Sequence, residues 1–127
     1  MPQLGAIVGC GLAAAVLGGC GGTSVNYPLD KQLVWRASVG EAMVWRPKIY
    51  DEEYRIVSEK KDLAGNAYRY ELKVRRDPNP FARRPSTRVT VSMEQTAPSR
   101  RRFVRLEEEF LQSLQAMLIQ LTTQPGS

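Results

Sequence analysis

The stretch from Ala67 to Arg75 reads AYRYELKVR and alternates between apolar and polar side chains. One face carries Tyr68, Tyr70, Leu72 and Val74, and the other carries Arg69, Glu71, Lys73 and Arg75. A period of two residues is typical of a β-strand with one buried face. The preceding stretch YRIVSEK, residues 54–60, is separated from it by the turn-like sequence DLAGN. The two stretches therefore predict a β-hairpin whose turn uses a glycine or asparagine at positive φ.

A third strand is expected over residues 87–95, in which apolar and polar residues alternate again. Val89, Val91 and Met93 would point inward, and Arg88, Thr90, Ser92 and Glu94 outward. The intervening stretch RRDPNPFARRPS, residues 75–86, carries prolines at positions 78, 80 and 85. These prolines exclude a helix and a central strand, so we expect a loop there. One face of the sheet should be exposed to water, because the outward positions are polar.

Two helices are expected to flank these strands. Residues 29–46 begin with a candidate N-cap at Asp30 and end before Pro47, which cannot continue a helix. A second helix, from Ser99 or Arg100 to Leu121, has apolar residues spaced three and four apart. Its apolar stripe comprises Phe103, Leu106, Phe110, Leu114, Met117 and Leu121, widened by Leu111 and Leu118. A stripe of this width suits a helix that lies on a sheet.

Together these elements predict an α+β fold over residues 29–121. We expect a two-layer sandwich in the order helix, three-stranded antiparallel sheet, helix. Both helices should cover the apolar face of the sheet, because that face must be buried against another layer. Residues 122–127 are polar and are expected to fray.

The N-terminal segment has a different character. Residues 4–19 are apolar or small, and residues 1–20 contain no Asp, Glu, Lys or Arg, so the net charge of +5 belongs to the remainder. Sixteen such residues are fewer than the ~20 needed to cross a bilayer as a helix, and their glycines weaken a permanent helix. The segment therefore predicts a cleaved signal peptide over residues 1–19. The alternative is a buried helix rich in glycine and alanine, with its cysteines as small core residues.

Leu17-Gly18-Gly19-Cys20 resembles the lipobox of bacterial lipoproteins, in which two small residues precede a cysteine. The resemblance implies cleavage between Gly19 and Cys20, a diacylglyceryl group on the Cys20 sulfur and attachment to a membrane through that lipid. Residues 20–28 are small and polar and would form a flexible tether. Because Gly21 is not Asp, the resemblance also implies an outer-membrane location facing the periplasm.

Two features depart from or compete with this motif. The chain begins Met-Pro-Gln-Leu and lacks the Lys or Arg with which such signals usually start. Cys10 is a poorer candidate than Cys20, because too little apolar sequence precedes it. The order of elements after the anchor resembles that of small bacterial envelope lipoproteins of unknown function.

Catalytic chemistry has little support in the composition. The chain has no His, which is the commonest acid–base group near neutral pH and the commonest metal ligand, and both cysteines lie within the first 20 residues. Asp51, Glu52 and Glu53 are adjacent, but no nucleophile, phosphate-binding loop or metal-ligand spacing accompanies them. We therefore expect no enzyme, no cofactor and no metal.

Arginines are the main candidate binding residues. The set comprises Arg75, Arg76, Arg83, Arg84, Arg88, Arg100, Arg101, Arg102 and Arg105. If the 75–86 loop and the start of the last helix meet, these residues would form one anion-binding patch. The simpler interpretation is a solvated surface, in which Glu107, Glu108 and Glu109 pair with Arg102 and Arg105. Nucleic acid is not expected as a partner, because Tyr68 and Tyr70 share their face with core residues.

The function expected from the sequence is therefore a membrane-anchored, non-enzymatic module of the bacterial envelope. Its arginines would bind an acidic partner or envelope polymer. An alternative is an accessory subunit that docks to an envelope protein through a free sheet edge. Another docking surface would be the aromatic residues Trp35, Trp45, Tyr50 and Tyr54, which more often close the edge of a small core.

Overall fold

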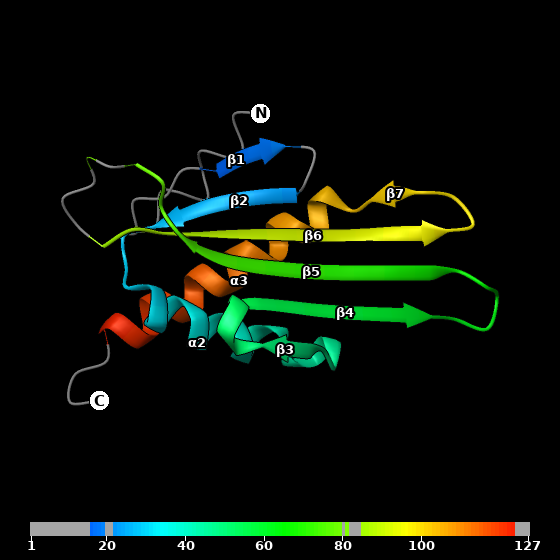
Figure 1. Cartoon of the computed structure of the whole chain (residues 1–127), viewed down its shortest axis with the longest axis horizontal. Helices are drawn as coiled ribbons and strands as arrows, with labels where there is room; N and C mark the ends of the chain where they lie inside the picture. The colour runs from blue at the N-terminus through cyan, green and yellow to red at the C-terminus, as the bar shows by residue number, and fades with distance from the viewer. Residues whose placement is uncertain (1–15, 20–21, 80, 82–84, 124–127) are drawn as a thin grey trace.

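The computed structural model describes residues 16–19, 22–79, 81 and 85–123. Within these residues one antiparallel sheet packs against two helices (Figure 1). Its strands are β1 (Val16–Gly19), β2 (Gly22–Tyr27), β3 (Lys48–Tyr50), β4 (Arg55–Lys61), β5 (Ala67–Arg76), β6 (Thr87–Ala97) and β7 (Arg101–Arg102). Six strands lie in the order β1-β2-β6-β5-β4-β3, and β7 pairs with β6. The α+β class is thus confirmed, whereas the prediction of three strands is wrong.

The additional strands include the segment that the sequence predicted to be a flexible tether. β2 pairs with β6 from Thr23↔Val91 to Tyr27↔Thr87, and β1 pairs with the other edge of β2. Thr23, Val25 and Tyr27 are buried, so this segment contributes an inward face to the core. A tether is therefore excluded for residues 22–27. Only two of the inward residues, Val25 and Tyr27, are apolar, because the third is Thr23, so the apolar alternation is too short to indicate a strand by local pattern alone.

The predicted hairpin is confirmed. β4 and β5 pair from Arg55↔Lys73 to Lys61↔Ala67. The Asp62 carboxylate accepts the backbone N–H groups of Ala64 and Asn66, both at 2.9 Å, and Gly65 adopts φ +89°. β5 then pairs with β6 along its whole length. The three predicted strands are therefore the centre of the sheet, and their boundaries are displaced by only one or two residues.

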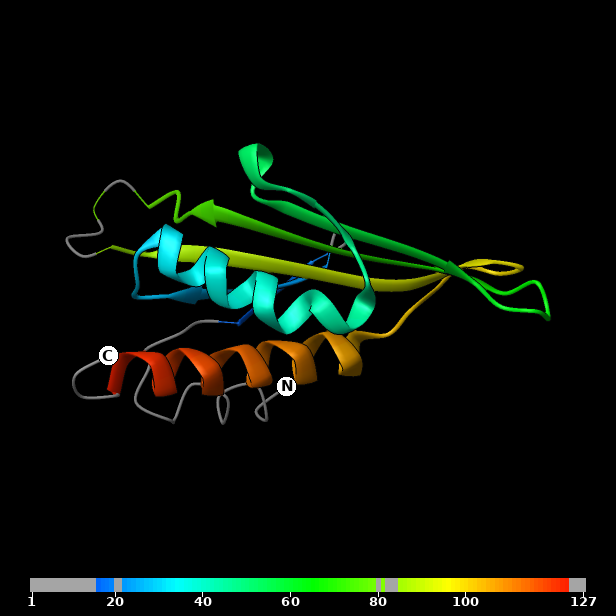
Figure 2. The same cartoon turned by 90° about the horizontal axis from the view of Figure 1, so that it is seen from below.

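The helices are α2 (Lys31–Ala42) and α3 (Val104–Thr123), and both lie on the same face of the sheet (Figure 2). Asp30 caps α2 as predicted, because its carboxylate accepts the N–H of Gln32 at 3.0 Å. A 3-10 turn, Met43–Trp45, continues α2 to Arg46, which precedes Pro47 in the left-handed conformation. The prediction that the last helix begins at Ser99 or Arg100 is wrong, because Arg101 and Arg102 form β7.

The core lies between the sheet and the two helices, and it corrects the predicted stripe of α3. Leu111, Leu114 and Leu118 are fully buried there, but Leu106 and Leu121 are 43 % and 45 % exposed. The buried face also includes the polar residues Glu107 and Gln115. The face that α3 turns toward the sheet is therefore rotated about the helix axis from the face on which its apolar residues are centred. α3 extends to Thr123, so the predicted frayed tail is helical at its first two residues, and residues 124–127 lie outside the described range.

Candidate functional site

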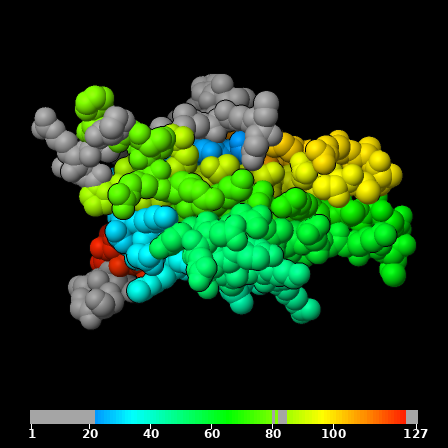
Figure 3. Space-filling model, viewed as in Figure 1, coloured from blue at the N-terminus to red at the C-terminus, as the bar shows by residue number. Residues whose placement is uncertain are grey.

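The helices cover only one face of the sheet, and the other face is open on the side seen in Figure 3. The outward positions of β4, β5 and β6 point to this face. Near the 77–86 loop these positions carry Arg55, Lys73, Arg75 and Arg88, which we name the basic face cluster. It is the candidate functional site, because it gathers cations on a face of the sheet that neither helix of the described part of the chain covers.

Cross-strand pairing places these cations close together. Arg75 lies opposite Arg88 in the β5–β6 register, and Lys73 lies between Arg55 on one side and Thr90 on the other. Like charges directly opposite each other in a sheet are unfavourable. Arg75 and Arg88 therefore raise the local positive potential without stabilising the strand pair. An oxyanion bound between them would relieve the repulsion, because guanidinium groups bind oxyanions through paired N–H donors.

The two guanidinium groups of this pair are held in position by neutral acceptors. The Arg88 Nε donates to the Asn26 side-chain oxygen at 2.9 Å, and the Arg75 Nη1 donates to the backbone carbonyl of Glu53 at 2.8 Å. These neutral acceptors orient the two groups, and Arg88 also interacts with the charge of the nearby Asp77 carboxylate. Arg55, in contrast, pairs with Glu71 at 3.2 Å. The positive charge available for binding an anion is therefore centred on Lys73, Arg75 and Arg88.

The same face is less positive toward the other end of the sheet. Arg69 lies there between Glu59 on β4 and Glu94 on β6, and its guanidinium is 3.6 Å from the Glu71 carboxylate. Acidic and basic residues thus alternate across the strands at this end. The open face has a charge gradient along its strands, with the positive end at the 77–86 loop.

The loop beside the basic face cluster is organised by Asp77. The N–H of Asn79 donates to the Asp77 carboxylate at 3.0 Å, and the Ser86 hydroxyl donates to it at 2.8 Å. These hydrogen bonds, the Asn79 N–H foremost, hold the pKa of Asp77 below its usual range, and Arg88 contributes to the shift. Asp77 therefore closes the loop as a carboxylate, while Phe81 is 86 % exposed within it.

The structure separates the arginines that the sequence analysis placed in one patch. Arg75 and Arg76 lie at the loop end of β5, whereas Arg101 and Arg102 lie in β7, beside the opposite end of β6 (Figure 1). Their partners on β6 are Thr87 and Arg88 for the first pair and Glu94 and Gln95 for the second, which separates the two pairs by about 20–25 Å at the usual rise of a strand. The prediction of a single patch is therefore wrong. Arg83 and Arg84 lie outside the described residues.

Arg102 takes part in a buried ion pair. Its Nη2 lies 2.7 Å from the Glu107 carboxylate, which is fully buried and also accepts the Thr23 hydroxyl at 2.7 Å and the Met93 N–H at 2.8 Å. This network joins β2, β6, β7 and the start of α3. Arg105 and Glu109 pair at the expected helical spacing, 3.4 Å apart on the surface. Arg102 is thus part of an ion pair that joins elements of the fold. Among the predicted pairs, only Arg105 with Glu109 has the i,i+4 spacing of a helix.

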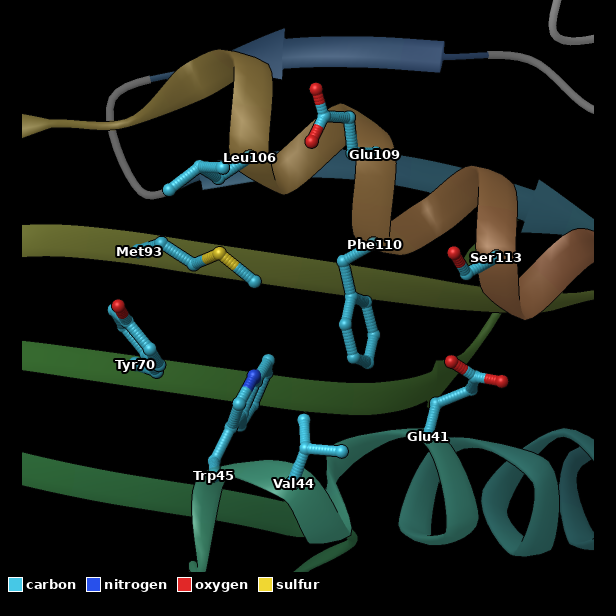
Figure 4. Close-up of a pocket in the computed structure, with 9 residues that line it drawn as sticks. All are labelled: Glu41, Val44, Trp45, Tyr70, Met93, Leu106, Glu109, Phe110 and Ser113. Carbon is cyan, nitrogen blue, oxygen red and sulfur yellow. The ribbon is translucent and has the colours of Figure 1, made fainter.

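A groove that sequence reasoning missed lies between the 3-10 turn after α2 and the first turns of α3 (Figure 4). Its volume is about 350 Å³, and its base contains Trp45, Tyr70 and Phe110. The ring of Trp45 lies 4.8 Å from Phe110 and 5.4 Å from Tyr70 between centroids. The exposed residue Val44 lines one side of it. No local pattern indicates this groove, because its walls come from five separate elements, namely α2, the 3-10 turn, β5, β6 and α3.

The remaining candidates from the sequence analysis are the tryptophans and the run of three acidic residues. Trp35 and Trp45 are both buried in the core, which is the simpler of the two roles considered for them, and Trp35 donates to the Asp51 carboxylate at 3.2 Å. Asp51, Glu52 and Glu53 form an exposed 3-10 turn. Within the described ranges, no group of three or more His, Cys, Asp or Glu residues is arranged to hold a metal ion.

Comparison with known proteins identifies no relative, since no protein-family model, curated protein or solved structure matches the chain. Neither helix of the described part of the chain is long and apolar enough to span a membrane.

Proposed function

We propose that the chain is the precursor of a bacterial lipoprotein anchored through Cys20, and that its folded part is a non-enzymatic module that binds an anionic envelope polymer. Leu17-Gly18-Gly19-Cys20 supports the anchor, because it has the residue types of a lipobox. The basic face cluster supports the binding role, because it places positive charge on the sheet face that neither described helix covers. The opposed pair of Arg75 and Arg88 is the single observation that carries the binding proposal.

The anchor is tested by intact mass and membrane fractionation of the chain expressed in a bacterium. We expect a membrane-bound protein that begins at Cys20 and carries acyl chains. Cys20→Ser should remain uncleaved and carry no lipid, and Cys10→Ser should behave as the unaltered chain. A soluble protein that retains Met1 would contradict the proposed anchor.

The binding role is tested with two double variants that change the net charge equally. Lys73→Ala with Arg88→Ala alters the basic face cluster, whereas Arg36→Ala with Arg105→Ala removes two exposed charges from the helix layer. We expect the first variant to bind polygalacturonate or polyphosphate at least about tenfold more weakly, since the loss of even one charged hydrogen bond costs about 1.5–3 kcal/mol. The second should bind nearly as the unaltered protein does.

Salt provides a further criterion for the same role. Binding through exposed cations should weaken as the NaCl concentration rises, because salt screens these charges. Equal losses in both double variants would indicate a general effect of net charge and would refute the proposed site. Binding that does not respond to salt would refute it as well.

A second candidate function is an accessory subunit that docks to an envelope protein. The observation that favours it is the short edge strand β3, which carries the exposed aromatic residue Tyr50 and leaves an edge free among the described residues. Site-specific cross-linking from Tyr50 in intact envelopes should then recover one defined protein. Recovery of the same products from a cross-linker at the exposed residue Gln112, on α3, would argue against this candidate.

A further inference from the structure

The outer edge of β2 is paired with a strand that belongs to the proposed signal peptide. β1 pairs with β2 over four residues, from Val16↔Val25 to Gly19↔Gly22 (Figure 1). The proposed cleavage hydrolyses the peptide bond between Gly19 and Cys20, so the whole of β1 would leave with the signal peptide. β2 would then become an edge strand of the sheet, with the backbone N–H and C=O groups along its outer side unpaired.

β2 has contacts of its own that hold it in the sheet. It pairs with β6 over five residues, and its inward residues Thr23, Val25 and Tyr27 are buried. The Thr23 hydroxyl donates to the Glu107 carboxylate at 2.7 Å, and the Tyr27 hydroxyl donates to the backbone carbonyl of Leu111 at 3.1 Å. These contacts attach β2 to α3 as well as to β6. We therefore expect β2 to keep its position after the loss of β1.

The edge uncovered in this way has none of the usual protection. The unpaired backbone groups of an edge strand are a template for another strand, and natural edges are commonly protected by a charged residue or a proline. Residues 22–27 read GTSVNY and include neither. The side chains that point to the open face, Ser24 and Asn26, are small and uncharged, so a second backbone can approach closely. The pairing with β1 already places an antiparallel strand on this edge.

We infer that the β2 edge uncovered by cleavage pairs antiparallel with the same edge of a second mature copy, so that two sheets join into one. The inference rests on the proposed cleavage before Cys20. A two-fold axis beside Val25 would pair this residue with its equivalent and place Thr23 opposite Tyr27 of the second copy. The inward residues of both copies then lie on one face of the joined sheet, as the period of two requires.

A second copy suits this edge for two reasons. Two uncharged β2 strands meet without repulsion, although each chain carries a net charge of +5. Attachment to one membrane would also raise the local concentration of copies, which favours their association. The joined sheet would present both basic face clusters on one open face, and a single anionic polymer could then contact both. In the precursor β1 covers the edge, so the pairing is confined to the mature chain.

Single-thiol cross-linking tests this pairing on the full chain matured in a bacterium. Maturation removes Cys10 and converts Cys20 to a thioether, so one introduced cysteine would be the sole free thiol. Ser24→Cys places this thiol beside the inferred axis, within reach of its equivalent through a short bismaleimide. Ser113→Cys is the matched control, because Ser113 is exposed on α3 and lines the groove toward α2.

We expect the covalent dimer to form several-fold more at position 24 than at position 113. The uncleaved chain with Cys10→Ser, Cys20→Ser and Ser24→Cys has the same sole thiol but retains β1, and it should give several-fold less dimer. Equal yields at the two positions, equal yields with and without β1, or cross-linking of position 24 to a different protein would overturn the inferred pairing.

The mass of the mature protein in detergent, measured by sedimentation, gives a test without cross-linking. The unaltered chain and Ser113→Lys should be dimers, whereas Ser24→Lys should be a monomer, because a lysine on the edge opposes its equivalent across the axis. A monomeric unaltered chain, or a dimeric Ser24→Lys, would overturn the inference. Intact mass separates the two proposals: an uncleaved wild-type chain refutes both, whereas a cleaved and lipidated monomer refutes only the pairing.

Discussion

Replacing Glu107 by alanine should destabilise the protein far more than the same change at Glu109, two residues further along α3. Glu107 is fully buried and accepts hydrogen bonds from Thr23, Met93 and two nitrogens of Arg102. Its removal leaves a buried hydroxyl, a buried N–H and a guanidinium that is only 26 % exposed without their acceptor. Breaking one side of a buried pair costs about 3–5 kcal/mol. Because Arg102 keeps some contact with solvent, we expect the lower part of that range.

Glu109→Ala is the matched control, because its partner Arg105 is 91 % exposed and the pair lies on the surface. We expect a loss below about 0.5 kcal/mol there. Equilibrium urea unfolding at neutral pH measures both changes, with the fluorescence of the buried Trp35 and Trp45 as the signal. Free energies of unfolding for Glu107→Ala and Glu109→Ala that agree within about 0.5 kcal/mol, or a Glu107→Ala loss below about 1 kcal/mol, would refute the reasoning.

Two further stability predictions concern the β2 strand. Gly22→Ala should cost about 2–4 kcal/mol in thermal unfolding, because Gly22 has φ +133° and a Cβ there would lie 2.5 Å from the Val91 carbonyl oxygen. Gly40→Ala should instead stabilise by about 0.5–1 kcal/mol, since a Cβ in that helix meets nothing within 4 Å; a loss at Gly40 equal to that at Gly22 would contradict the structure. Burial raises the pKa of Tyr27, whose hydroxyl donates to the Leu111 carbonyl at 3.1 Å. The folded state then holds this proton more tightly than the unfolded state, so stability should be complete below about pH 10 and fall as the pH rises above it. Tyr27→Phe should show a shallower alkaline loss, measured as the urea midpoint against pH, and an unchanged slope would be evidence against the burial of this phenol.

The elements in which apolar residues recur with a regular period over many residues were predictable from the sequence. The alternation over Ala67–Arg75 indicated β5, because the residues on one face of a strand are set by a period of two regardless of the neighbouring strand. The spacing of apolar residues likewise predicted α3, although its start was placed too early. Arg101 and Arg102 were assigned to that helix, since nothing in their own sequence indicates that they pair with Glu94 and Gln95 on β6.

The candidate site was only partly predictable for a similar reason. The outward position of Arg75 follows from the alternation of its own strand, and so does that of Arg88. Their direct opposition depends on the register between β5 and β6. The prediction that Arg101 and Arg102 share a patch with Arg75 required knowledge of which strand ends meet. That arrangement depends on the length and direction of β6, which separates the two groups.

The sequence alone determined the net charge, the central hairpin, the amphipathic character of the last helix and the lipobox-like segment. Only the tertiary structure decided that Gly22–Tyr27 joins the sheet, that the arginines lie at opposite ends, and which acid is buried. Glu107, Glu108 and Glu109 are identical as residues, and their order gives no reason to bury one of them. Glu107 is buried because the packing of α3 against β2 and β6 brings the donors of Thr23, Met93 and Arg102 to that single position. Which of the three glutamates is buried depends on contacts between segments far apart in the chain, and local periodicity does not encode such contacts.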